Sequence, residues 1–222
     1  MKHILFGLFF IMMTKSYGQE PKRFLALGDS YTVGEKVEQS QTWPYQLASY
    51  LSENDAGVAQ PEVIAVTGWR TDELLDSIAQ QNFKPNSFEL VSLLIGVNNQ
   101  YQNKPFKTFK IEFEHLVQVA IELCSGDQKG VFLVGIPDYS LSPFAKEKQL
   151  KGVSSSLKRY NRFIRKMSKK YKLNYYPLQK LSKPLHKNPS MLAEDLLHPN
   201  ADQYKVWVNS FKESVLQQLN TF

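Results

Sequence analysis

Cysteine is almost absent from this 222-residue chain, and histidine is scarce. The single Cys124 has no second cysteine with which to pair, so an internal disulfide framework is excluded. The chain holds four histidines, and no two of them have the spacing of a metal-ligand pair, so we expect no metal site. Cys124 falls on the apolar side of an expected helix, and we therefore expect it to be buried and inert.

Internal repeats, low-complexity tracts and linker-like stretches are also lacking. Hydrophobic residues make up 42% of the chain and charged residues 22%, which are ordinary proportions for one globular domain with a full core. The formal net charge is +6, and the basic residues are concentrated only around residues 158–172. Because a charged run of this kind is usually the solvated face of a helix, we expect no nucleic-acid partner.

No apolar run is long enough to cross a bilayer as a helix. The run at residues 4–13 follows a basic start and precedes small residues, an order typical of a secretory signal peptide. We therefore expect residues 1–18 to be removed and residues 19–222 to form the mature domain, with an uncleaved signal anchor as the alternative. No cysteine lies near the cleavage site, so lipid attachment there is not expected, and the mature protein is predicted to be secreted or periplasmic.

Short apolar runs alternate with amphipathic segments along the rest of the chain. The expected strands are residues 24–27, 63–66, 90–95, 131–134 and 175–176. The expected helices are residues 42–51, a segment capped by Thr71, and residues 105–123, 154–171 and 201–219. Continuous apolar strands that alternate with helices predict a parallel sheet covered on both faces. The predicted fold is a three-layer α/β/α sandwich with a parallel, flavodoxin-like five-stranded sheet.

The first expected strand runs directly into Gly28-Asp29-Ser30. In an open α/β sheet, ligands bind just beyond the carboxyl ends of the strands. A serine hydroxyl there is reachable from solvent and lies near main-chain N–H groups that have no ladder partner. Ser30 is therefore the candidate nucleophile, and the alternative is that Asp29 and Ser30 only cap a turn or a helix.

Other candidate groups fall at corresponding places. Gly68 and Asn98 also follow expected strands, so the Ser30 and Gly68 N–H groups and the Asn98 amide can together stabilise a developing oxyanion. Asp195 and His198 are three residues apart, a spacing that lets the carboxylate orient the imidazole while its other nitrogen faces Ser30. Each residue also has a structural explanation, as a turn residue at 68 and 98 or a helix cap at 198.

In this order, Gly28-Asp29-Ser30, Gly68, Gly96-Val97-Asn98-Asn99 and Asp195-Leu196-Leu197-His198 resemble the four blocks of the SGNH (GDSL-type) hydrolases. The resemblance covers nearly the whole mature chain, and residues 19–222 are interpreted as one hydrolase domain. It implies that Ser30 is the nucleophile, that His198 and Asp195 supply base and acid, and that Ser30, Gly68 and Asn98 form the oxyanion hole. It implies no metal and no cofactor.

The chain departs from the family pattern at two places. Asn99 stands where the third block usually has Asp, and Tyr31-Thr32 follows the serine in place of Leu-Ser. Asn99 is not one of the catalytic positions, so this change is not expected to abolish activity. Tyr31 and Arg70 are candidates to shape the substrate pocket.

These observations predict an exported serine esterase that cleaves carboxylic esters through an acyl-enzyme intermediate. Its expected substrate is a small-molecule, glycan or lipid ester, since the family includes lysophospholipases, thioesterases, carbohydrate acetylesterases and arylesterases. A carbohydrate O-deacetylase is one alternative, and a non-catalytic glycan- or lipid-binding protein on the same scaffold is another. The loops expected at residues 139–152 and 180–194 are too short to form a lid domain.

Overall fold

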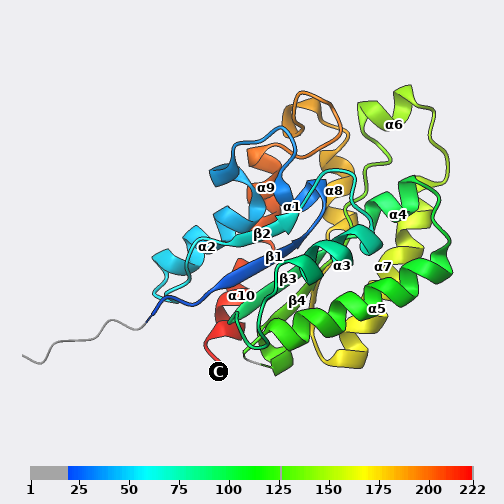
Figure 1. The fold of residues 1–222 in the computed structure, drawn as a ribbon. Coiled ribbons are helices and arrows are strands. Elements are labelled where there is room, and N and C mark those ends of the chain that lie inside the picture. Colours follow the sequence, from blue (N-terminus) through cyan, green and yellow to red (C-terminus); the bar gives the residue numbers. More distant parts are fainter. Residues whose placement is uncertain (1–19, 126, 222) are drawn as a thin grey trace, which may run out of the picture.

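The computed structural model describes residues 20–125 and 127–221, so the expected signal peptide at residues 1–18 lies outside the described residues. Five parallel strands form one sheet in the order β2-β1-β3-β4-β5 (Figure 1). The strands are β1 (Phe24–Gly28), β2 (Glu62–Ala65), β3 (Leu90–Leu94), β4 (Val131–Val134) and β5 (Asn174–Tyr176). This is the flavodoxin-like strand order, and the predicted fold class is confirmed.

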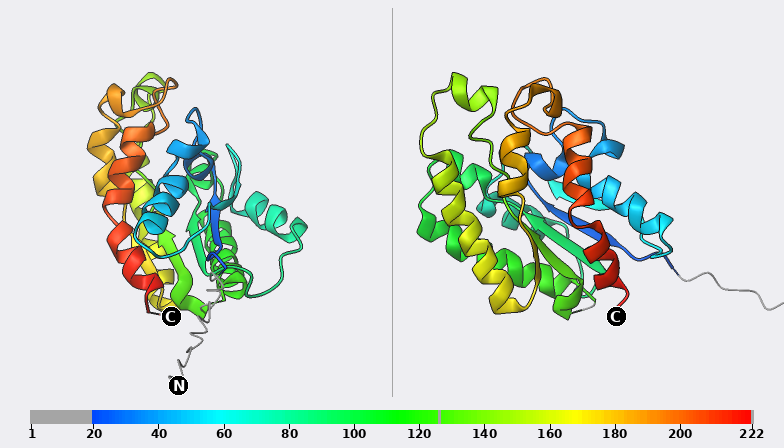
Figure 2. Two further views of the ribbon diagram at one scale, coloured as in Figure 1. Left: turned by 90° about the vertical axis from the view of Figure 1, so that its left-hand side faces the viewer. Right: turned by 180° about the vertical axis from the view of Figure 1, so that it is seen from behind.

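Helices cover both faces of the sheet (Figures 1 and 2). One layer holds α2 (Trp43–Glu53), α9 (Ala201–Asn209) and α10 (Lys212–Leu219). The other layer holds α3 (Thr71–Gln80), α5 (Phe106–Leu123) and α7 (Val153–Tyr171). Every residue of β1, β3 and β4 is buried, which explains why these strands are apolar along almost their whole length, with Ser92 in β3 as the polar exception.

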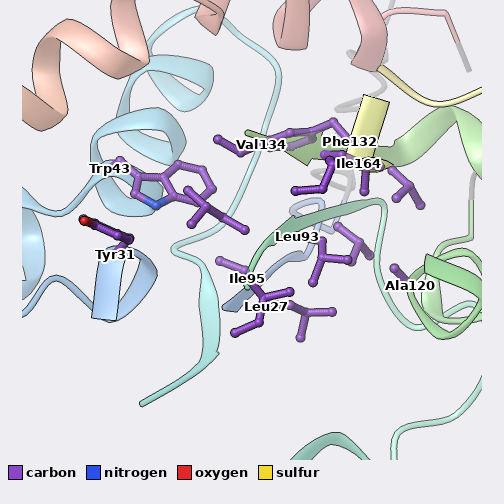
Figure 3. Packing of buried hydrophobic residues seen from close by; sticks show 14 of the residues in the cluster. Leu27, Tyr31, Trp43, Leu93, Ile95, Ala120, Phe132, Val134 and Ile164 are labelled. Atoms are coloured by element: carbon purple, nitrogen blue, oxygen red, sulfur yellow. The ribbon is translucent and has the colours of Figure 1, made fainter. Parts of the chain in front are cut away.

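Large apolar side chains from both layers fill the core. Trp43 from α2 and Ala120 from α5 pack toward strand residues such as Leu93 (Figure 3). Trp43 and Leu93 are fully buried, and burial of a large apolar side chain stabilises the fold by roughly 1.5–3 kcal/mol. Cys124 is buried as expected, although it follows the last residue of α5.

Short helices occupy several segments expected to be loops. They are α1 (Ser30–Val33), α4 (Val97–Tyr101), α6 (Pro143–Glu147) and α8 (Gln179–Leu185), with 3-10 turns η1 (Gln39–Gln41), η2 (Asp127–Gly130) and η3 (Pro189–Met191). The first three helices sit at the carboxyl end of the sheet, where they place side chains around one cavity. None of the described helices is long and apolar enough to cross a membrane.

The expected helix at residues 201–219 is two helices. The break falls at Phe211, whose φ of −141° leaves the helical region. Its ring lies 6.1 Å from that of Trp43 and 5.1 Å from that of Tyr176, so burial of this aromatic ring accompanies the break. The start of α3 also differs by one residue, because its N-cap is Arg70 and Thr71 is the first helical residue.

Candidate active site

The candidate site lies beyond the carboxyl ends of β1 and β3. After β1 the chain moves to β2, toward one edge of the sheet, and after β3 it moves to β4, toward the opposite edge. The strand order reverses between these two neighbours, which is where open α/β sheets form their ligand crevice. Because β1 leads into Ser30 and β3 leads into Asn98, both residues reach this crevice.

A cavity of about 110 Å³ opens at this point. It is lined by Ser30, Tyr31, Thr67, Gly68, Val97, Asn98, Tyr101, Tyr139, Phe144, Leu197 and His198. The structure therefore brings Ser30, Gly68, Asn98 and His198 to one cavity, although they are far apart in the sequence. Asp195, the fifth predicted residue, lies behind His198 and contacts it directly.

Asp195 holds His198 from a tight loop. The Asp195 Oδ2 atom is 2.6 Å from His198 Nδ1, and Oδ1 accepts the N–H groups of Leu197 and His198 at 2.9 Å each. Burial raises the pKa of Asp195, but the hydrogen bonds from the His198 ring and from these two N–H groups outweigh it and lower the pKa to about 2. The carboxylate therefore stays charged at neutral pH and directs the other ring nitrogen of His198 away from itself.

Ser30 is the first residue of α1, and Asp29 is the cap of that helix. The Asp29 Oδ1 atom accepts the N–H of Tyr31 at 3.1 Å, while the Ser30 N–H meets no acceptor among the described residues. No hydrogen bond joins Ser30 Oγ to His198 in the described part of the chain. Such bonds are often long before substrate binds, and both residues still face the same cavity.

Asn98, in α4, and Gly68, in the loop after β2, line the same cavity as Ser30. The Asn98 Nδ2 group uses one N–H to donate to Trp69 O at 3.0 Å, and its second N–H has no acceptor in the part of the chain that the structure describes. The Gly68 N–H has no acceptor among the residues that the structure describes. The residue has a φ of +88°, a conformation that favours glycine. Together with Ser30, these groups supply three free donors at one cavity.

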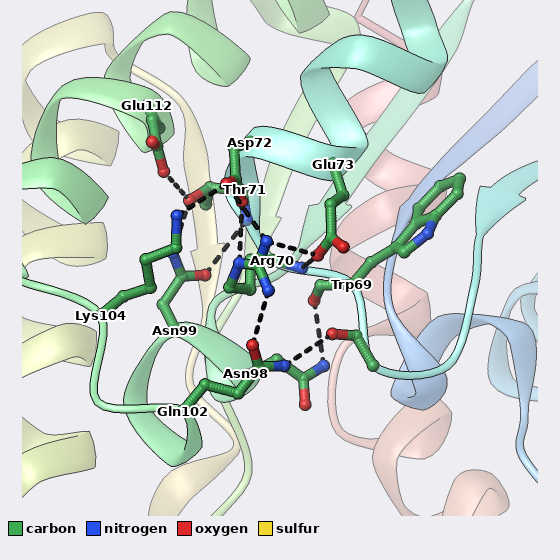
Figure 4. Close-up of polar contacts among 11 residues, drawn as sticks. Trp69, Arg70, Thr71, Asp72, Glu73, Asn98, Asn99, Gln102, Lys104 and Glu112 are labelled. Carbon is green, nitrogen blue, oxygen red and sulfur yellow. Dashed lines mark hydrogen bonds and ion pairs between the residues drawn. The ribbon is translucent and has the colours of Figure 1, made fainter.

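A polar clamp joins the loop that carries Gly68 to α4 (Figure 4). The Gln102 side chain donates to Gly68 O at 3.1 Å, next to the bond from Asn98 to Trp69 O. The Asn99 side chain accepts Thr71 N at 3.1 Å and donates to Thr71 Oγ1 at 2.7 Å. These side chains from α4 and its C-cap residue therefore hold the Gly68 loop in place.

Comparison with known proteins identifies the family. The chain matches the GDSL-like Lipase/Acylhydrolase family over residues 26–206. The chain belongs to this family. The resemblance seen in the sequence is thus confirmed, and the GDSL-like hydrolase is an ester-hydrolysing enzyme. No curated protein sequence matches it.

Solved structures share the fold of this GDSL-like hydrolase at low sequence identity. The psychrotrophic esterase EstA from Pseudoalteromonas sp. is 15% identical, with a TM-score of 0.66 over 90% of this chain and 100% of that one. TesA is 17% identical, with a TM-score of 0.68 over 89% and 99%. The acetylxylan esterase Axe2 from Geobacillus stearothermophilus is 14% identical, with a TM-score of 0.66 over 90% and 95%.

Tyr31 and Arg70 have different positions in the GDSL-like hydrolase. Tyr31 lines the cavity, as expected, and its ring lies 5.6 Å from that of His198 and 6.0 Å from that of Trp207. Arg70 is not among the residues that line the cavity. Its guanidinium binds Asp72 and Gln102 instead, as part of the polar clamp.

Other residues of the site were not predicted. Gln102, Tyr101, Tyr139 and Phe144 belong to no motif, and only the fold brings them together. The sequence did carry one signal, because the aromatic residues at 101, 139 and 144 all lie shortly after expected strands. No group of three or more possible metal-ligating side chains occurs among the described residues.

His186 is a buried neighbour of the site. It is the C-cap of α8 and is fully buried, with Nδ1 3.0 Å from Ser182 O. Burial lowers the pKa of His186 to about 4, although Asp138 opposes this change. The side chain is therefore neutral at pH 7, and it does not line the cavity.

Proposed function

We propose that the chain is an exported serine esterase that cleaves carboxylic esters through an acyl-enzyme intermediate. The observation that carries this proposal is the arrangement around the cavity. A serine, a histidine held by a carboxylate, and three free hydrogen-bond donors all reach it. These are the parts that nucleophilic acyl transfer needs.

In the first half of the reaction, Ser30 Oγ attacks the ester carbonyl carbon while His198 Nε2 takes the hydroxyl proton. The carbonyl oxygen becomes an oxyanion, which accepts hydrogen bonds from Ser30 N, Gly68 N and Asn98 Nδ2. Asp195 stabilises the imidazolium that forms. When the intermediate collapses, the ester C–O bond breaks and His198 returns the proton to the departing alcohol.

In the second half, water replaces Ser30 as the nucleophile. His198 takes a proton from the water, which attacks the acyl carbon of the acyl-enzyme. The second intermediate uses the same three donors, and its collapse breaks the bond to Ser30 Oγ. His198 then returns the proton to Ser30, so the carboxylic acid is released and the enzyme is restored.

A phosphonate probe tests the assignment of Ser30. A fluorophosphonate should label the wild-type chain, whereas Ser30→Ala should not be labelled and should lose ester hydrolysis with its circular dichroism spectrum unchanged. Ser155→Ala is the matched control, because Ser155 is an exposed serine on α7, outside the cavity. Equal labelling of wild type and Ser30→Ala would rule out Ser30 as the nucleophile.

Export rests on the basic, apolar and small residues of the N-terminal segment. We expect a bacterium that expresses residues 1–222 to release a mature chain beginning at Gln19 outside the cytoplasm. N-terminal sequencing of the secreted and periplasmic fractions measures this. A cytoplasmic product that retains Met1, or a membrane-bound product with an intact N-terminus, would contradict the proposal.

A further inference from the structure

The cavity wall beyond the reacting groups is apolar and aromatic. It is formed by Val97, Tyr101, Tyr139, Phe144 and Leu197. A polar wall would offer donors and acceptors to a sugar, whereas a wall of this kind favours a hydrocarbon group. The part of the substrate that lies against it is therefore expected to be apolar.

One side of this wall is closed by an aromatic pair from two separate elements. Tyr101 ends α4 and Phe144 lies in α6, and their ring centroids are 6.2 Å apart. The α6 segment is anchored, because Ser142 Oγ accepts Ala145 N at 3.1 Å and Ala145 is buried. Phe144 N also lies 3.5 Å from Leu196 O, in the loop that carries His198. The wall is thus tied to the loop beside the reacting groups.

The size of the cavity limits the acyl group. An apolar protein cavity of about 150 Å³ binds one benzene molecule, which has six carbons, so a cavity of about 110 Å³ holds roughly four groups of that size. These correspond to an ester carbonyl and about three further carbons. Longer chains would meet the Tyr101 and Phe144 rings.

Two of the hydroxyl groups of the wall already donate to neighbouring side chains. Thr67 Oγ1 already donates to Glu35, and Tyr139 OH donates to Gln100 Oε1 at 3.0 Å. Tyr101 of the wall is 45% exposed, and beside the cavity the large apolar side chains of Val66 and Leu196 are 46% and 41% exposed. All three lie on the segments that form the cavity, so its surroundings are apolar as well.

We infer that this site selects esters of short acyl groups, of about two to four carbons, with apolar alcohols, and that Tyr101 and Phe144 set the limit on acyl length. The inference rests on the proposed function and names its substrate class. It separates the site from that of a sugar deacetylase, because an apolar alcohol group is preferred to a sugar.

The acyl arm of the test uses 4-nitrophenyl esters from acetyl to dodecanoyl. The wild type should have its highest kcat/KM between acetyl and butyryl and lose at least tenfold by octanoyl. Phe144→Ala and Tyr101→Ala should raise the ratio of octanoyl to butyryl hydrolysis about tenfold. Phe144 is only half-buried on a short helix, so its truncation should leave the fold intact. Ile111→Ala is the matched control, since it removes an exposed apolar side chain outside the cavity.

The alcohol arm compares benzyl acetate with the triacetate of methyl xyloside, whose 2-, 3- and 4-acetates leave as ordinary alcohols. Benzyl acetate should be the better substrate by at least tenfold in kcat/KM. Equal rates, or faster cleavage of the sugar acetate, would overturn the preference for an apolar alcohol. A flat or rising acyl series, or an unchanged series in Phe144→Ala and Tyr101→Ala, would overturn the acyl limit.

The labelling experiment distinguishes these failures from failure of the proposed function. If wild type is labelled by the fluorophosphonate and cleaves long esters well, it is a serine esterase with a different pocket preference, and this inference is wrong. If it is neither labelled nor active on any ester, the proposed function is wrong and this inference falls with it.

Discussion

The amide of Asn98 serves two purposes within the site. One N–H holds Trp69 O at 3.0 Å, and the other is free to meet an oxyanion. Gln102 contributes to the same loop through Gly68 O but does not line the cavity. The two residues therefore allow the role of a donor in the cavity to be separated from the role of a loop support.

Asn98→Ala should lower kcat by roughly 10²–10³, as removal of one preorganised oxyanion donor does. KM should change far less, because the donor acts mainly on charge that develops during the reaction. Steady-state kinetics on 4-nitrophenyl acetate measures both constants. Gln102→Ala, which removes only the loop support, should lose less than tenfold in kcat. Similar losses for the two variants would show that Asn98 acts only by holding the loop.

Asp29 gives the fold a dependence on pH. Burial raises its pKa from 3.8 to about 7, although the N–H groups of Tyr31 and Gly96 oppose this change. Between these two pH values the native carboxyl keeps a proton that the unfolded chain releases. The stability that Asp29 provides is therefore fully present below about pH 4 and is lost as the pH rises to about 7.

Asp29→Asn should remove the loss of folding stability that Asp29 causes as the pH rises, because Asn does not titrate. It should also keep the helix cap, because Asn caps as well as Asp. The variant should gain stability relative to wild type as the pH rises, on the order of a few kcal/mol by pH 8. Urea unfolding of both chains at pH 4, 6 and 8 measures the difference. A difference that stays constant across this range would mean that Asp29 does not titrate there.

Only some residues of the site could be predicted from the sequence. Ser30, Gly68 and Asn98 could be placed together because each follows an apolar run, and parallel strands bring their carboxyl ends to one edge. Gln102 and Phe144 could not, because their contacts join segments far apart in the chain and no local pattern encodes them. The structure gives Asn99 a role in holding Thr71, which its departure from the family pattern did not reveal.

At the scale of elements, the strands and long helices were predictable and the short helices were not. The helix α5, expected at residues 105–123, begins at Phe106 and ends at Leu123, because its apolar residues recur at helical spacing on one face. The helix α8 contains Pro184 and lies in a segment without periodicity, so it was expected to be a loop. Tertiary packing determines such short elements more than local sequence does.

Two strand-end glycines make a matched pair. Gly68 and Gly96 have φ values of +88° and +119°, which other residues rarely adopt. A Cβ atom at Gly68 would meet nothing within 4 Å, whereas one at Gly96 would lie 2.6 Å from Phe109 Cε2. Gly68→Ala should therefore cost about 1–2 kcal/mol from backbone strain alone. Gly96→Ala should cost roughly 1–3 kcal/mol more, from overpacking.

Urea unfolding at one pH measures this pair. The expected order of stability is wild type, then Gly68→Ala, then Gly96→Ala. The crowding at Gly96 also suggests a control. Gly96→Ala should cost less stability when it is made in the Phe109→Leu variant than when it is made in the wild type, because the ring that the new Cβ atom meets is then absent. Equal losses for the two single variants would show that the Phe109 side chain moves aside without cost.

At the scale of the whole molecule, the sheet brings the loops that form the candidate active site together at the carboxyl ends of its strands. The segments after β1, β2, β3 and β4 all contribute to the cavity, and the loop before α9 brings His198 to it (Figure 1). The segment at residues 139–152 adds Tyr139 and Phe144 to the wall, so it bends over the site without forming a lid domain. The cavity is bounded by side chains of short, anchored segments.

This arrangement predicts an enzyme without interfacial activation. A lid that opens at a lipid surface must leave its closed position at little cost, but α6 is held by a buried Ala145, by the contact of Phe144 with Tyr101 and by the approach of Phe144 N to Leu196 O. Hydrolysis of tributyrin should therefore rise smoothly with concentration and saturate with no change at the solubility limit. Titration of the released acid across that limit measures the rate, with acetyl and butyryl esters of 4-nitrophenol as soluble references. An abrupt increase in rate once droplets form would mean that α6 does move away from the cavity at an interface.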